Sequence, residues 1–293
     1  MFAASTTAAR AYTFPVVASF SRWDEKVDAS VGTFVVLNDD GWIATAAHMF
    51  NIGQRMVADL PQVAALRQEI AEVEANPDLK PGYRARQLRQ LQGKARPDWL
   101  VKTSYWWAVD GVVLQDVRLV PALDLAIGKL DPFPRNVFST HAVIKNPAVG
   151  LDPGTSLCRL GFPFPQIQAT YDEVASAFRF DVADLTHFPI DGIFTRILDQ
   201  GVVPGATFRG LWIETSSPGL RGQSGGPVYD TRGRLWGIQS KTSHIPLGFD
   251  PEITVQGKQV KEHQFINLGL ALHPQSLIDV LTDQGVPFEM SAD

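Results

Sequence analysis

Short apolar runs separated by turn residues dominate the chain. Residues 33–37 and 42–46 are rich in β-branched and aromatic side chains, and the Asn-Asp-Asp-Gly sequence at 38–41 suits a tight turn. This pattern predicts a β-hairpin. Further strands are predicted over 112–120, 125–130, 157–162, 211–215, 235–240 and 265–272. Many short strands with Gly- and Pro-rich turns indicate an all-β sandwich or barrel.

The segment 59–96 has helical periodicity instead. Val63, Leu66, Ile70 and Val73 recur every three or four residues and form one apolar stripe. Pro and Gly residues then interrupt the pattern before a second helical run, so we predict a helical hairpin. Acidic residues on the first helix and arginines on the second favour antiparallel packing. The hairpin is also a candidate lid over an active site or docking surface for a partner protein.

Three other segments complete the predicted organisation. The proline-rich stretch 131–154 is expected to connect two halves of the chain, and 166–189 is expected to be an irregular insertion. Residues 274–285 predict a short helix that ends at Gly285.

Composition narrows the class of protein. The 26 Lys and Arg residues against 31 Asp and Glu residues give a net charge of −5, which favours neither nucleic acid nor anionic membranes. Cys158 is the only cysteine, so a disulfide-dense secreted scaffold is excluded. The chain has neither a leader pattern nor an apolar run long enough to span a membrane, and we expect it to be cytoplasmic.

The strongest chemical signal is the Gly-Gln-Ser-Gly-Gly-Pro sequence at 222–227. Glycines on both sides of Ser224 allow a sharp turn and close approach to a substrate. Such a turn can direct N–H groups at one point, where they would stabilise an oxyanion. A serine hydroxyl is a weak nucleophile by itself, so a base must activate it.

His48 and Asp124 are the candidate partners of Ser224. His48 ends an apolar run of small residues, Thr-Ala-Ala-His at 45–48, and has the most distinctive setting among six histidines. Asp124 lies within an apolar run, where an unpaired carboxylate would cost stability. Asp110 and Asp116 are weaker candidates because they lie among polar or turn residues. In the resulting arrangement Asp124 would orient the imidazole and stabilise its charged form.

In this order, the motifs at 45–48, 124–126 and 222–227 resemble those of the trypsin-like (chymotrypsin-fold) serine peptidases. The resemblance implies a mainly β fold of two six-stranded barrels, here with an inserted helical hairpin and a short C-terminal helix. It implies an N-terminal barrel over 12–135 and a C-terminal barrel over 136–293. It further implies an oxyanion hole formed by the N–H groups of Gly222 and Ser224, and places Ser240 on the strand that binds substrate.

The positions at which this sequence differs from the family's motifs indicate which branch of the family it resembles. Gln223 stands where an aspartate pairs with a newly cut N-terminus in digestive members, so we expect no activation by N-terminal cleavage. The chain is most similar to bacterial heat-shock peptidases, without their PDZ domain. Pro218, six residues before the serine, is expected at the base of the primary pocket and predicts a small or apolar side chain before the cleaved bond.

Two other functions fit parts of the sequence. The residues at 222–226 also match the nucleophile elbow of α/β-hydrolase esterases, for which Asp250 and His273 are formal partners. A peptidase-like barrel pair used only for binding is the second alternative. We expect no cofactor and no metal site, because no ligand spacing or phosphate-binding glycine motif is present. The expected partners are a protein or peptide substrate and a regulatory protein bound through the hairpin at 59–96.

Overall fold

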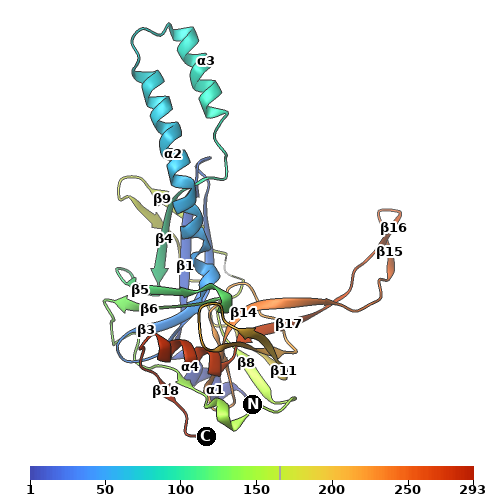
Figure 1. The fold of residues 1–293 in the computed structure, drawn as a ribbon. Helices are drawn as coiled ribbons and strands as arrows, with labels where there is room; N and C mark the ends of the chain where they lie inside the picture. Colours follow the sequence, from blue (N-terminus) through green and yellow to red (C-terminus); the bar gives the residue numbers. More distant parts are fainter. Residues whose placement is uncertain (165) are drawn as a thin grey trace.

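The computed structural model describes residues 1–164 and 166–293, which form two large, mainly antiparallel β-sheets, two small two-stranded sheets and attached helices (Figure 1). The α-helices are α1 (Ala3–Arg10), α2 (Asn51–Ala75), α3 (Pro81–Gln92) and α4 (Pro274–Asp283). Short 3-10 helices cover Ala47–Phe50, Pro121–Leu123 and Pro147–Val149. None of the helices in the described ranges has an apolar stretch long enough to cross a lipid bilayer.

The first sheet has six strands in the order β4-β1-β2-β3-β6-β5. Its strands are β1 (Thr13–Arg22), β2 (Val27–Val36), β3 (Trp42–Ala46), β4 (Leu100–Trp107), β5 (Val113–Val120) and β6 (Leu125–Asp131). Phe34, Ile43 and Trp107 are among the fully buried side chains between its strands. The predicted hairpin is present, since β2 and β3 pair with Val35 opposite Ala44.

The second sheet has eight strands in the order β13-β8-β11-β12-β17-β14-β7-β18. Pairing of β13 with β14 closes six of these strands into a ring, and β7 and β18 extend it with parallel pairing. The strands are β7 (Val143–Ile144), β8 (Ser156–Arg159), β11 (Ile190–Val202), β12 (Arg209–Thr215), β13 (Pro227–Tyr229), β14 (Leu235–Pro246), β17 (Phe265–Leu272) and β18 (Glu289–Met290). The predicted mainly β fold is confirmed, with the second barrel enlarged by this strand pair.

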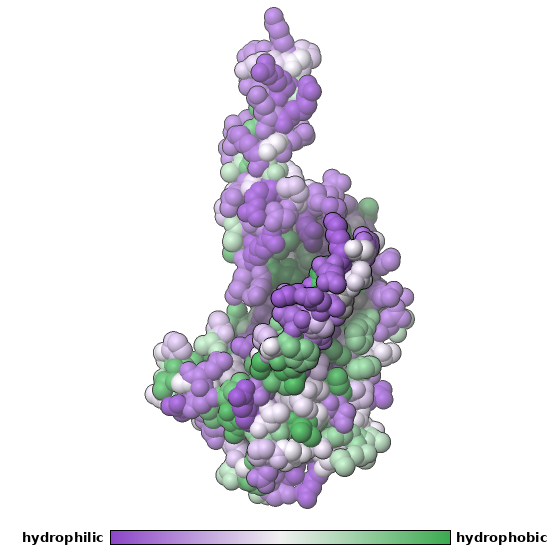
Figure 2. Space-filling model, turned by 90° about the vertical axis from the view of Figure 1, so that its right-hand side faces the viewer, coloured by the Kyte–Doolittle hydropathy of each residue, from purple (hydrophilic) through white to green (hydrophobic). Residues whose placement is uncertain are grey.

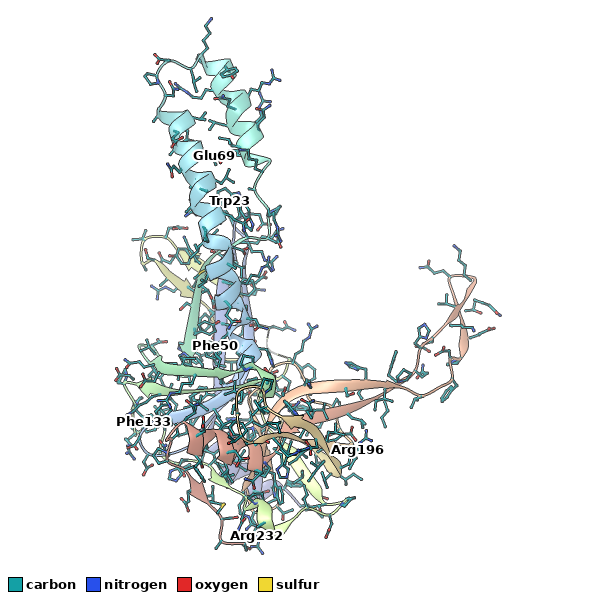
Figure 3. The ribbon with its side chains drawn as sticks, in the orientation of Figure 1. Trp23, Phe50, Glu69, Phe133, Arg196 and Arg232 are labelled. Carbon is teal, nitrogen blue, oxygen red and sulfur yellow. The ribbon has the colours of Figure 1, made fainter. Side chains whose placement is uncertain are left out.

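The predicted helical hairpin is formed by α2 and α3, and it projects from the body (Figure 1). It begins at Asn51, earlier than the expected residue 59, because the short helix that follows β3 continues directly into α2. Val63 and Leu66 of the predicted stripe are buried with Leu91 and Trp99 at its base. Towards the tip the surface of the hairpin is hydrophilic (Figure 2). Figure 3 labels Glu69 on α2 and Trp23, which comes from the turn between β1 and β2 and packs against the base of the hairpin.

Two small hairpins leave the second half of the chain. The insertion predicted as irregular contains paired strands β9 (Thr170–Asp172) and β10 (Ala177–Arg179). Strands β15 (Glu252–Val255) and β16 (Lys258–Lys261) form the end of an arm that extends from β14 and β17 (Figure 1). The predicted C-terminal helix is present as α4.

Candidate active site

Asp124 fixes the position of His48 through three hydrogen bonds. The Asp124 carboxylate lies 2.8 Å from His48 Nδ1 and accepts from the His48 backbone N–H at 2.9 Å. The carbonyl of the same aspartate accepts from Ala47 N–H at 3.0 Å. Asp124 adopts a left-handed conformation (φ 47°) after the 3-10 helix Pro121–Leu123, a conformation that aspartate tolerates better than most residues. The aspartate found by its apolar sequence context is therefore the partner of His48.

Ser240 supplies a further donor to the same carboxylate. Its hydroxyl donates to Asp124 Oδ2 at 2.5 Å across the two sheets. Burial alone would raise the pKa of Asp124, but the hydrogen bonds from His48 and Ser240 hold that pKa below its ordinary value. Asp124 therefore stays ionised at neutral pH and can favour the charged form of the imidazole.

The serine loop is held by Thr33 of β2, a residue of the first sheet. Thr33 N–H donates to Ser224 O at 2.8 Å, and the Thr33 hydroxyl donates to Gly222 O at 2.7 Å. Gly222 (φ 93°) and Gly225 (φ 83°) have positive φ angles, and a Cβ atom at either position would overlap backbone atoms of other segments. The glycines on both sides of Ser224 are thus required by the turn itself.

Ser224 and His48 line a common pocket of about 720 Å³, which we call the first pocket. Met49, Ile52 and Leu220 contribute to its mostly apolar wall. The described side chains of Ser224 and His48 share no hydrogen bond, and His48 remains 39% exposed. Catalytic hydrogen bonds of this kind are often long in a protein without substrate and shorten when the substrate binds.

The backbone around Ser224 leaves two N–H groups available. Within the described chain, the N–H groups of Gly222 and Ser224 donate to no protein atom, whereas those of Gln223, Gly225 and Gly226 are all bonded. Gln223 N–H donates to Leu220 O at 2.9 Å, and Gly225 N–H donates to Gln239 O at 2.7 Å. This alternation leaves free the two donors expected for an oxyanion hole.

Gln223 is fully buried and bridges two neighbouring loops. Its amide oxygen accepts from Leu220 N–H at 3.0 Å, and its amide nitrogen donates to Phe188 O at 3.2 Å. Because the Gln223 side chain is neutral and bonds to uncharged backbone groups, it does not need the amine of a cleaved N-terminus as a partner. The loop is therefore braced by the insertion that carries Phe188.

Pro218 and Ser240 line a second pocket of about 520 Å³, which also includes Ser224. Gly219, Gln239 and Thr242 also line it, and the Thr242 hydroxyl donates to Gly219 O at 2.7 Å. Both residues expected to bind substrate thus lie beside the candidate nucleophile. The sequence analysis did not identify Gln239, or Arg159, which lies behind it.

The esterase alternative is wrong. Ser224 is followed by the strand β13 rather than by a helix, and the pairings within the first sheet are antiparallel. Its formal partners are elsewhere, because Asp250 contacts His263 on the arm and His273 caps α4. An α/β-hydrolase site needs the serine at a strand-to-helix turn.

Solved structures share this arrangement of sheets. The active form of the Rv3671c protease from M. tuberculosis aligns with a TM-score of 0.50 at 12% identity, covering 98% of this chain and 86% of that one. The HtrA-type protease AlgW with a decapeptide aligns with a TM-score of 0.50 at 16% identity, covering 97% of this chain and 67% of that one. The chain has the fold of the trypsin-like serine peptidases. No family profile and no curated protein sequence matches this chain.

Proposed function

We propose that this protein is a serine endopeptidase that cleaves protein or peptide substrates through an acyl-enzyme intermediate. Ser224 attacks the scissile carbonyl, and His48 accepts its proton and returns it to the leaving amine. Asp124 holds the imidazole and stabilises its charged form. The observation that carries this proposal is the 2.8 Å contact between His48 Nδ1 and Asp124, with His48 on the same pocket as Ser224.

The free N–H groups of Gly222 and Ser224 support the same reaction. As the carbonyl oxygen gains negative charge, two fixed donors stabilise it without reorganisation of the loop. The Ser240–Thr242 segment borders the second pocket, where the side chain before the cleaved bond would lie.

Regulation by inserted segments, rather than by N-terminal cleavage, is the second part of the proposal. His48 lies in the short helix Ala47–Phe50, which continues into α2 of the helical hairpin. Phe50 lies at the foot of α2 (Figure 3), and Ile52 of the same helix lines the first pocket. A regulatory partner bound to the hairpin could therefore act on the position of His48 through one continuous segment.

A fluorophosphonate probe, which reacts with activated serines, tests the proposed chemistry. We expect labelling of the wild type and of Ser243→Ala, a control for a nearby serine of β14, but not of Ser224→Ala. The same Ser224→Ala variant should lose about 10⁶-fold in peptide turnover. Absence of labelling and of cleavage in the wild type would instead favour a peptidase-like binding module.

A further inference from the structure

Arg159 is a buried cation without a carboxylate partner. It is 1% exposed, on β8 in the interior of the second sheet. Its guanidinium donates to Gln239 Oε1 at 2.5 Å, to Ser217 Oγ at 2.7 Å and to Thr215 Oγ1. No ion pair within the described residues includes Arg159. Because burying an uncompensated charge is costly, the absence of a counter-ion requires an explanation.

The charge persists under ordinary conditions. Burial lowers the pKa of the Arg159 guanidinium to about 10, which leaves it protonated at neutral pH. Packing is tight around it, since a Cβ atom on Gly269 of β17 would overlap the guanidinium. Arg159 therefore has a fixed charge and a fixed position.

Arg159 sets the orientation of the Gln239 amide at the second pocket. A guanidinium can only donate hydrogen bonds, so the amide oxygen of Gln239 must face Arg159 and the amide nitrogen must face away from it. That nitrogen donates one hydrogen to Lys241 O at 3.1 Å and lies directly against Gly219, which lines the pocket. Gln239 is 1% exposed, so its amide nitrogen lies beneath Gly219 at the floor of the second pocket, with a cation behind it.

The rim of the second pocket has the same electrostatic character. Arg221 and Lys241 line the pocket and are exposed, and neither forms an ion pair within the described chain. Among the described residues that line this pocket there is no aspartate or glutamate. Floor and rim thus both favour a negatively charged occupant.

We propose that the second pocket selects an acidic side chain, glutamate or aspartate, before the cleaved bond, with the Gln239 amide beneath the pocket floor and Arg159 as the positioning residue behind it. This inference rests on the proposed peptidase function and names its substrate class. It replaces the small or apolar preference expected from Pro218 alone, because Pro218 contributes no charge and only part of the wall. The substrate carboxylate acts as the counter-ion that Arg159 lacks among the described residues.

Fluorogenic peptides that differ only before the cleaved bond test the proposal. Glutamate and glutamine have the same shape and differ in charge, so we expect kcat/KM for the Glu peptide to exceed that for the Gln peptide about 10- to 100-fold. An Ala peptide tests the apolar expectation. Equal rates for Glu and Gln, or faster cleavage after Ala, would overturn the acidic preference while leaving the peptidase function intact.

The variant Gln239→Glu separates selectivity from structure. It keeps the oxygen that accepts from Arg159 and adds a carboxylate, so the pocket floor loses its positive character. We expect the Glu-to-Gln rate ratio to fall to 1 or below, whereas Gln90→Glu on the exposed face of α3 should leave the ratio unchanged. A merely structural defect lowers both rates alike, so an unchanged ratio in Gln239→Glu contradicts the assignment.

Binding to Ser224→Ala provides a test that does not need turnover. Product peptides ending in Glu or Gln are titrated into this variant, and we expect the Glu peptide to bind about 10-fold or more tightly. Equal affinities, or no binding of either peptide, overturn the acidic pocket. Selective binding without probe labelling or cleavage would instead count against the peptidase function and leave the pocket assignment standing.

Discussion

Asp124 and Arg159 each bond to a residue that lines the second pocket, but the two charges have different partners. Asp124 is bonded to His48 and Ser240, and the imidazole is a partner able to carry the opposite charge. Arg159 is more deeply buried, yet its partners Gln239, Ser217 and Thr215 are all neutral. One charge has an ionisable partner within the fold, and the other has neutral partners only.

This difference separates two tasks of an enzyme site. A charge that must orient a reacting group is best held by the protein itself, because its position must not depend on the substrate. A charge that must recognise a substrate is best left without a protein counter-ion, because the substrate then supplies the missing interaction. On this view the Asp124 side serves chemistry and the Arg159 side serves selection.

Within this comparison, the largest expected effect on activity comes from replacing Asp124. Asp124→Asn keeps the shape but favours the wrong tautomer of His48, so we expect kcat to fall about 10⁴-fold. The matched control is Asp116→Asn, because Asp116 is an exposed aspartate of β5 with a similar positive φ. This variant should retain full activity. Peptide hydrolysis under saturating substrate measures both. A loss below 10-fold for Asp124→Asn would remove the distinction drawn here.

His273 is a buried ionisable group that loses its charge, whereas Asp124 and Arg159 keep theirs. Burial lowers its pKa from 6.5 to about 4, and neutral Nδ1 accepts from Gln275 N–H at 3.1 Å to cap α4. The imidazole binds a proton more readily in the unfolded chain than in the folded protein. The free energy of unfolding therefore falls by about 3 kcal/mol as the pH is lowered from above 6.5 towards 4.

His273→Asn keeps a side chain that can accept at the helix N-terminus and removes the titration. Urea unfolding at pH 7 and pH 4.5 should therefore show a smaller acid loss in this variant than in the wild type. The exposed His263→Asn is the control and should keep the wild-type difference. Identical acid losses in all three proteins would show that His273 is not responsible.

Supplying the missing counter-ion should stabilise the fold. In Gln239→Glu the buried Arg159 gains a carboxylate in place of an amide, while the hydrogen bond from Gln239 Nε2 to Lys241 O is lost. Because we expect the new ion pair to outweigh that loss, unfolding should cost about 1–2 kcal/mol more. Denaturant unfolding at neutral pH measures this change. Together with the loss of selectivity, the gain would show that the wild type gives up stability for recognition. A variant less stable than the wild type would contradict that interpretation.

The smallest effect is expected from the tip of the helical hairpin. Its buried contacts, including Val63, Leu66 and Leu91, lie near the base, whereas the tip is exposed and hydrophilic (Figure 2). Replacing residues 74–88 by a short Gly-Ser linker should leave the melting temperature and basal peptide hydrolysis unchanged. Any response to a regulatory partner should disappear. A large change in basal activity would place the tip in the site itself.

The candidate residues that the structure brings together were easier to predict from the sequence than the strands were. His48, Asp124 and Ser224 were recognisable because each lies in a short motif whose chemistry is local. The strands β1, β4 and β11 were missed because they lack clean alternation of apolar and polar residues, and their pairing depends on distant partners. The second sheet's extra strands β7 and β18 are two residues each, too short to leave a periodic signal.

Arg159 could have been found by the rule that found Asp124. It is a lone charged residue between Leu157, Cys158 and Leu160 in a predicted strand, and an unpaired charge there needs a partner. What sequence could not provide was the partner's identity, since Gln239 lies on another strand and is brought to Arg159 only by the closed sheet.

The contact of Thr33 with the serine loop has a consequence for synthesis in the cell. Residues 222–226 take their shape from a strand made almost 190 residues earlier and bond to Gln239 of β14, which pairs with β17, a strand that ends at Leu272. A nascent chain therefore contains His48 and Asp124 long before it contains a formed oxyanion turn. The proposed hydrolytic site therefore forms only when nearly the whole polypeptide has been synthesised, so on this proposal an unfinished chain has no peptidase activity.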